Sequence, residues 1–162
     1  MKKKYYIIGL CVVVLIALVI ALISIFHYDV ITCTDSIKED KYTIKSTYKI
    51  YHKKDIVKKV EITREVDSKN TTILSFFEKN YKDEFEKYNK EYNGYKIKSS
   101  KTKDKMILNI TWNVKDAKLD KLLEKRSFLK EDVIKDKKKK KVKQLKVDGV
   151  YKLFNLNKNN CK

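Results

Sequence analysis

Hydrophobic residues change their spacing several times along this chain, and each change marks a different predicted element. The first pattern is a run of 20 uncharged residues from Ile7 to Phe26, dominated by valine, isoleucine, leucine and alanine. A helix of that length rises about 30 Å, which matches the hydrocarbon core of a bilayer. Residues 7–26 therefore predict a transmembrane helix that makes the lipid bilayer a partner of the chain.

The residues around this run predict how the chain is oriented. Lys2, Lys3 and Lys4 precede it, and lysine-rich flanks stay on the cytoplasmic side. Residues 1–28 then form a cytoplasmic basic flank and a retained signal-anchor of a single-pass membrane protein, with the C-terminal domain extracellular. A cleaved signal peptide and a lipoprotein signal are the alternatives. The apolar core is long for the first, and neither Cys11 nor Cys33 follows the small residue that the second needs.

Residues 29–40 are polar and are interpreted as a linker, after which the spacing becomes that of β-strands. Apolar side chains alternate with polar ones on both sides of a polar break at 52–55, at Tyr42, Ile44, Tyr48, Ile50, Val60, Ile62 and Val66. This period of two predicts a hairpin with one buried face. His52, in the break, is interpreted as a turn residue.

The period then changes to that of a helix. Apolar and aromatic side chains recur at steps of three and four residues, at Ile73, Phe77, Tyr81, Phe85, Tyr88 and Tyr92. They predict an amphipathic helix whose aromatic seam packs on a sheet. Ser68, Asn70 or Thr71 is the expected N-cap, and Asn93-Gly94 the stop.

A second hairpin follows, and its later strand alternates from Met106 to Val114, with Trp112 expected in the core. Short helices are expected at 116–125 and around Val147–Phe154. The predicted fold is α+β: a four-stranded antiparallel sheet (ββαββ) packed on one long helix, with short C-terminal helices, in a domain spanning 41–162.

Three stretches resemble the YehR-like bacterial lipoproteins, the domain-of-unknown-function family 1307: "STYKIYHKKDIVKKVEITREV", "FFEKNYKDEFEKYNKEYNGYKIK" and "MILNITWNVKDAKLDKL". The resemblance runs from about Lys41 to Phe154 and implies an export signal followed by this order of hairpins and helices. The chain departs from that family because it has no lipobox cysteine, so a membrane span stands in place of the lipid anchor. The resemblance brings no catalytic residues.

The cysteines of the predicted extracellular part lie at its two ends, at Cys33 and Cys161. An even pair in an oxidising compartment predicts one structural disulfide. Free thiols are the alternative if the topology is reversed. Two cysteines and two histidines, His27 and His52, do not show the spacing of a metal site, and no catalytic residue or cofactor is expected.

Charge suggests a partner class without identifying it. The net charge is +18, but lysine outnumbers arginine 37 to 2, a bias that also fits AT-rich codon usage. The run Lys137, Lys138, Lys139, Lys140 and Lys141 predicts a solvated loop or edge that could contact an anionic envelope polymer or membrane headgroups. We expect a noncatalytic domain of the bacterial cell envelope. The alternative is a nucleic-acid-binding basic protein, intracellular or at the surface, although no motif for specific nucleic-acid recognition is present.

Overall fold

The computed structural model describes residues 16, 27–136 and 141–162. The predicted membrane span and Lys137–Lys140 thus lie outside the described residues, apart from Ile16. Among the residues described, no helix is both long and apolar enough to cross a membrane. The elements, in chain order, are β1 (Asp29–Lys38), β2 (Thr43–Lys53), β3 (Ile56–Asp67), α2 (Thr71–Tyr92), β4 (Tyr95–Lys101), β5 (Lys105–Asn113), α3 (Leu119–Lys125), β6 (Val133–Lys135), β7 (Val142–Leu145) and α4 (Val147–Leu153).

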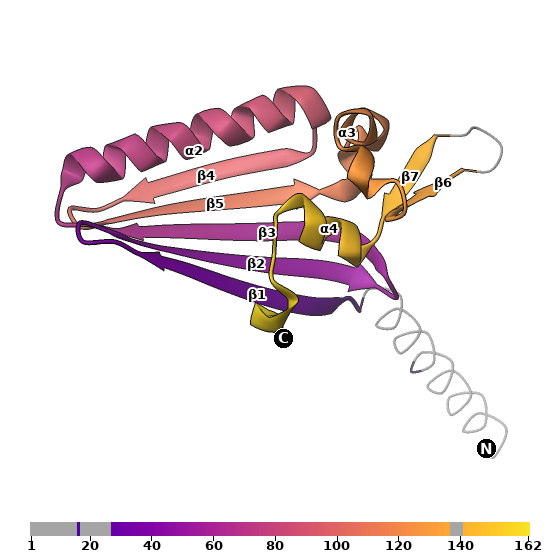
Figure 1. Cartoon of the computed structure of the whole chain (residues 1–162), viewed down its shortest axis with the longest axis horizontal. Coiled ribbons are helices and arrows are strands. Elements are labelled where there is room, and N and C mark those ends of the chain that lie inside the picture. Colours follow the sequence, from indigo (N-terminus) through magenta and orange to yellow (C-terminus); the bar gives the residue numbers. More distant parts are fainter. Residues whose placement is uncertain (1–15, 17–26, 137–140) are drawn as a thin grey trace, which may run out of the picture.

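The main sheet is antiparallel and has five strands in the order β1-β2-β3-β5-β4, so the α+β class is confirmed (Figure 1). The two predicted hairpins are β2–β3 and β4–β5. The predicted count of four strands is wrong, because β1 forms within residues 29–40 and pairs with β2 along its whole length. The sequence pattern of β1 does not indicate a strand with a buried face. Cys33 is its only buried residue, and Asp35 and Ile37, which alternate with it on the same side, are exposed.

The long helix α2 begins and ends at the residues that the sequence predicts. Asn70 caps it by accepting a hydrogen bond from the Thr72 amide at 2.9 Å. Asn93 and Gly94 end it with φ angles of 61° and 91°. Gly94 is needed there, because a Cβ would lie 2.7 Å from the Asn113 carbonyl oxygen.

The core lies between one face of the sheet and the helices, and α2 runs beside β4 and β5 (Figure 1). Trp112 is fully buried, as predicted, and its ring stacks on that of Tyr95 at 5.3 Å. The helix seam is only partly core: Phe85 and Tyr92 are buried, whereas Tyr81 and Tyr88 are half-buried. The packing of α2 on the sheet therefore buries only part of this aromatic seam.

The opposite sheet face carries polar side chains. One row crosses four strands in register, from Thr34 through Thr47 and Thr63 to Asn109. Thr63 donates a hydrogen bond to the Asn109 side chain at 3.1 Å. This open face is what an antiparallel sheet with helices on one side presents to water.

The C-terminal part adds a two-stranded hairpin, β6–β7, on either side of the lysine run, and this hairpin was not predicted. The predicted short helices are α3 and α4. From α4 the chain crosses the sheet, and its end lies beside β1 (Figure 1). Residues after α4 therefore cover the core at the β1 side of the sheet.

Candidate ligand-binding site

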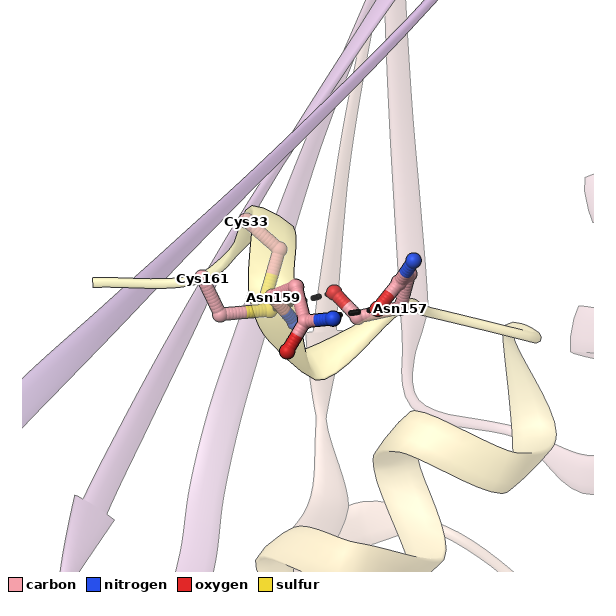
Figure 2. The surroundings of a disulfide bond; sticks show 4 residues. All are labelled: Cys33, Asn157, Asn159 and Cys161. Carbon is pink, nitrogen blue, oxygen red and sulfur yellow. Dashed lines mark hydrogen bonds between the residues drawn. A yellow bond between two sulfur atoms is a disulfide. The ribbon is translucent and has the colours of Figure 1, made fainter.

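The disulfide predicted between Cys33 and Cys161 is present in the structure and closes a loop with a sequence separation of 128 (Figure 2). Backbone hydrogen bonds support it, because Thr32 and Lys162 exchange two, at 2.8 and 3.0 Å. The Asn157 side chain accepts from the Asn159 amide at 3.0 Å and shapes the turn before Cys161 (Figure 2). The last residues thus form a short antiparallel bridge with β1.

A cavity of about 200 Å³ lies between α2, the sheet and the segment that follows α4. Its walls are mainly aromatic: Tyr48, Phe85, Tyr88, Tyr92, Tyr95 and Phe154. Its charged residues are Arg64, Glu84 and Arg126. Both arginines of the chain therefore line one cavity, although 37 other basic residues are lysines.

Arg64 enters the cavity from the inner face of β3, where its strand neighbours Ile62 and Val66 are buried. Its side chain is only 17% exposed. The guanidinium lies over the rings of Tyr81 and Phe85, at 4.4 and 5.3 Å from their centres. Such cation–π contacts offset part of the cost of taking the charge out of water.

The polar contacts of Arg64 are incomplete. Its Nη1 donates to Glu84 Oε2 at a long 3.5 Å. Its Nε is buried and has no hydrogen-bond partner within the described part of the chain. Burial disfavours its charge, but the Tyr48 hydroxyl and the Glu84 carboxylate outweigh burial, so the pKa of Arg64 is above its ordinary value. A guanidinium has five donors, so Arg64 keeps donors for a further acceptor.

Arg126 follows the last residue of α3 and is exposed. Its backbone amide donates to the Leu122 carbonyl oxygen at 2.9 Å, which fixes its place at the helix end. Because arginine stays protonated, the cavity carries two positive charges against one carboxylate. The site is therefore net positive by about one charge.

Three tyrosines of the cavity, Tyr88, Tyr92 and Tyr95, stay neutral. Burial, followed by nearby acidic and phenolic groups, raises the pKa of Tyr95 far above its usual range. Burial and the Glu84 carboxylate likewise raise the pKa of Tyr88, and burial and Glu91 raise that of Tyr92. The aromatic walls therefore supply flat surfaces and hydroxyl groups without adding negative charge.

A second cavity of about 230 Å³ adjoins the first and shares Tyr48, Phe154 and Asn155 with it. Cys33 also lines it. Asn155 has a φ of 52°, a left-handed conformation that turns the chain after α4. Two of the three shared residues, Phe154 and Asn155, therefore belong to the segment that the disulfide ties to β1.

The other residues singled out in the sequence lie away from this site. His52, interpreted from the sequence as a turn residue, lies instead near the end of β2, and the turn itself is formed by Lys54 and Asp55; His52 Nδ1 is 2.7 Å from the Lys54 carbonyl oxygen. Lys141 is exposed, and it is the only member of the lysine run that is described. Across the described residues, no group of three or more His, Cys, Asp or Glu side chains is placed to hold a metal ion.

Sequence reasoning missed the arginine cavity, although one signal was available. That signal is the presence of only two arginines, Arg64 and Arg126, among 37 lysines, because both line the same cavity. Comparison of the chain with family models, curated proteins and solved structures finds no match. The YehR-like resemblance therefore stays a prediction, and function is argued from the residues alone.

Proposed function

We propose that this protein is a membrane-anchored, noncatalytic binding domain of a bacterial cell envelope, held on the outer side of the cell membrane by residues 7–26. The Cys33–Cys161 disulfide carries the proposal, because structural disulfides persist in oxidising compartments and are rare in the cytosol. The uncharged run after Lys2–Lys4 supports the same orientation.

A binding role suits the chemistry of the arginine cavity better than catalysis does. General acid–base catalysis needs a group that gains and loses a proton near the working pH. Arginine stays protonated, and the raised pKa values keep Tyr88, Tyr92 and Tyr95 protonated as well. The remaining group, Glu84, lies beside Arg64 and serves as the counter-ion of its guanidinium.

An anionic envelope polymer is a second candidate ligand, and the open sheet face favours it. Lys45, Lys49, Lys96 and Lys98 project from β2 and β4 on that face, and within the described chain none forms an ion pair. Lys45 and Lys49 lie opposite Glu65 and Glu61 of β3, whereas Lys96 and Lys98 lie opposite uncharged Thr111 and Asn109. Lys96 and Lys98 are therefore the lysines of this face that would attract a polyanion, in a salt-dependent way. Lys137–Lys141 stays a predicted extension of this contact.

The location is tested by protease treatment of intact bacterial cells that express the full chain with a C-terminal epitope tag. We expect the domain to be cut while a cytoplasmic marker survives, with fragments separated under reducing conditions. Full protection in intact cells, followed by cleavage after lysis, would contradict the extracellular location and favour the intracellular nucleic-acid-binding alternative.

The disulfide is tested on protein exported by the native host. Mass spectrometry of a non-reduced tryptic digest should give the Cys33 and Cys161 peptides as one linked species. If both thiols are free in that material, the observation that carries the proposed location is lost.

A further inference from the structure

We propose that the cavity between α2, β3 and the segment after α4 binds a small monocarboxylate with a planar body. This inference rests on the proposed binding role and is independent of the proposed location. Its first basis is the convergence of Arg64 and Arg126, which come from β3 and from the end of α3. A lysine-dominated chain has thus placed both of its planar, forked cations at one cavity.

Arg64 has the donors that such a ligand needs. Charged donors sealed in an apolar wall are costly unless they meet an acceptor. Arg64 Nη1 donates to Glu84 only at a long 3.5 Å, and the Tyr48 hydroxyl also lies beside the guanidinium, so these two groups leave part of its five donors without an acceptor. Because Nε is shielded from solvent, the terminal nitrogens of the guanidinium are the ones that would meet a carboxylate.

Charge balance selects a monoanion. Arg64 and Arg126 contribute two positive charges and Glu84 one negative charge, and the raised pKa values keep Tyr88, Tyr92 and Tyr95 neutral. A carboxylate brings the site to neutrality. A phosphate dianion would leave excess negative charge beside Glu84, so the site favours the carboxylate.

Size and wall chemistry select a flat body. At about 30 Å³ for each water, the cavity holds about seven water volumes, which is less than a drug-sized pocket. Aromatic rings such as Tyr88 and Phe154 stack on planar groups and add little to the binding of compact ions. A single ring with one carboxylate satisfies both conditions.

Benzoate is the probe, and isothermal titration calorimetry of the full chain in a neutral detergent is the measurement. We expect benzoate to bind with a Kd in about the millimolar range, the ordinary affinity of so small a ligand. Benzamide, which has the same shape without the charge, should bind at least about tenfold more weakly. Inorganic phosphate should also bind more weakly.

Three variants assign the binding to this cavity. R126Q should weaken benzoate binding about tenfold, and because Arg126 is exposed, the variant is expected to fold. R64K keeps the charge but loses the fork, and should weaken binding by a similar factor. E84Q should tighten it several-fold, because it releases Arg64 and removes the negative charge; a purely structural role of Glu84 predicts no gain.

The matched control is K121Q, which removes one exposed positive charge from α3, the helix that precedes Arg126. It should leave the Kd unchanged within a factor of about two, because its effect is only long-range and screened. Equal binding of benzoate and benzamide, tighter binding of phosphate, or equal effects of R126Q and K121Q would each overturn the inference. None of these results bears on protease accessibility in cells, so the two proposals fail separately.

Discussion

Replacing both cysteines of the disulfide, as C33A/C161A, should remove a large part of the domain's stability. The disulfide joins residues separated by 128 positions. In the chain-entropy model, closing a loop of that size destabilises the unfolded chain by about 5 kcal/mol. Alanine is chosen because Cys33 is only 2% exposed and a serine hydroxyl there would be buried.

Measured losses usually fall below the model value, so we expect the free energy of unfolding to fall by about 3–5 kcal/mol. Total stabilities of small domains are about 5–15 kcal/mol. The two hydrogen bonds between Thr32 and Lys162 should fray with the loss of the disulfide. The rate of hydrogen exchange at the Thr32 amide should therefore increase in the double variant.

Equilibrium urea unfolding followed by circular dichroism measures the change. With an m-value of about 2 kcal/mol/M, the midpoint should fall by about 2 M. The m-value itself should rise, because the unlinked chain exposes more surface when it unfolds. Reduction of the wild-type protein should reproduce both changes, and C11A, which leaves the disulfide intact, should reproduce neither.

A loss below about 1 kcal/mol with an unchanged m-value would refute this reasoning. It would mean that the unfolded chain already keeps its ends together, so that the disulfide restricts nothing. In that case, the last residues would be held to β1 by their noncovalent contacts alone.

Three further predictions concern the sheet and α2. Lys82 and neighbouring donors lower the pKa of Glu78 to about 2. The Glu78 carboxylate therefore contributes to stability above pH 4.5, and this contribution is lost as the pH falls toward 2. In acid unfolding curves, the stability difference between wild type and E78Q should shrink over that range. G94A should lower the free energy of unfolding by about 2 kcal/mol or more in urea, because alanine at φ 91° is strained and its Cβ would meet the Asn113 oxygen. W112A should lower the free energy of unfolding by about 3–5 kcal/mol in the same urea assay. W112F should lower it much less, because the indole N–H has no hydrogen-bond partner within the described chain and its loss removes no hydrogen bond. A similar loss in both variants would contradict this.

The regular elements could be predicted because their signals are local. Asn70 and Gly94 mark the ends of α2 within a few residues, and the alternation around Trp112 identifies β5 without reference to the rest of the chain. The edge strand β1 was missed because half of its inward side chains are uncovered. Asp35 places a charge between Cys33 and Ile37 on the inward side, so the alternation of apolar residues is interrupted.

The candidate site could not be predicted in the same way, because it depends on long-range packing. The residues of the site come from separate parts of the chain and meet only when the sheet, α2 and the C-terminal segment pack together: Arg64 lies in β3, Glu84 in α2, Arg126 directly after α3 and Phe154 directly after α4. The aromatic seam was interpreted as core, which is right for Phe85. The half-buried Tyr88 lines the cavity together with the buried rings of Phe85 and Tyr92, so the same seam serves both the core and the cavity wall.

The disulfide also determines what happens when the backbone is cut. Cys33 lies near the start of the described domain and Cys161 is the penultimate residue, so almost the whole domain lies within one covalent ring. A single peptide bond broken anywhere between these cysteines opens the ring but releases no fragment. Both pieces remain attached to the N-terminal segment until the disulfide is reduced. A nicked domain would therefore stay covalently joined to residues 1–32, and two cuts between the cysteines are needed before any part of it can be released.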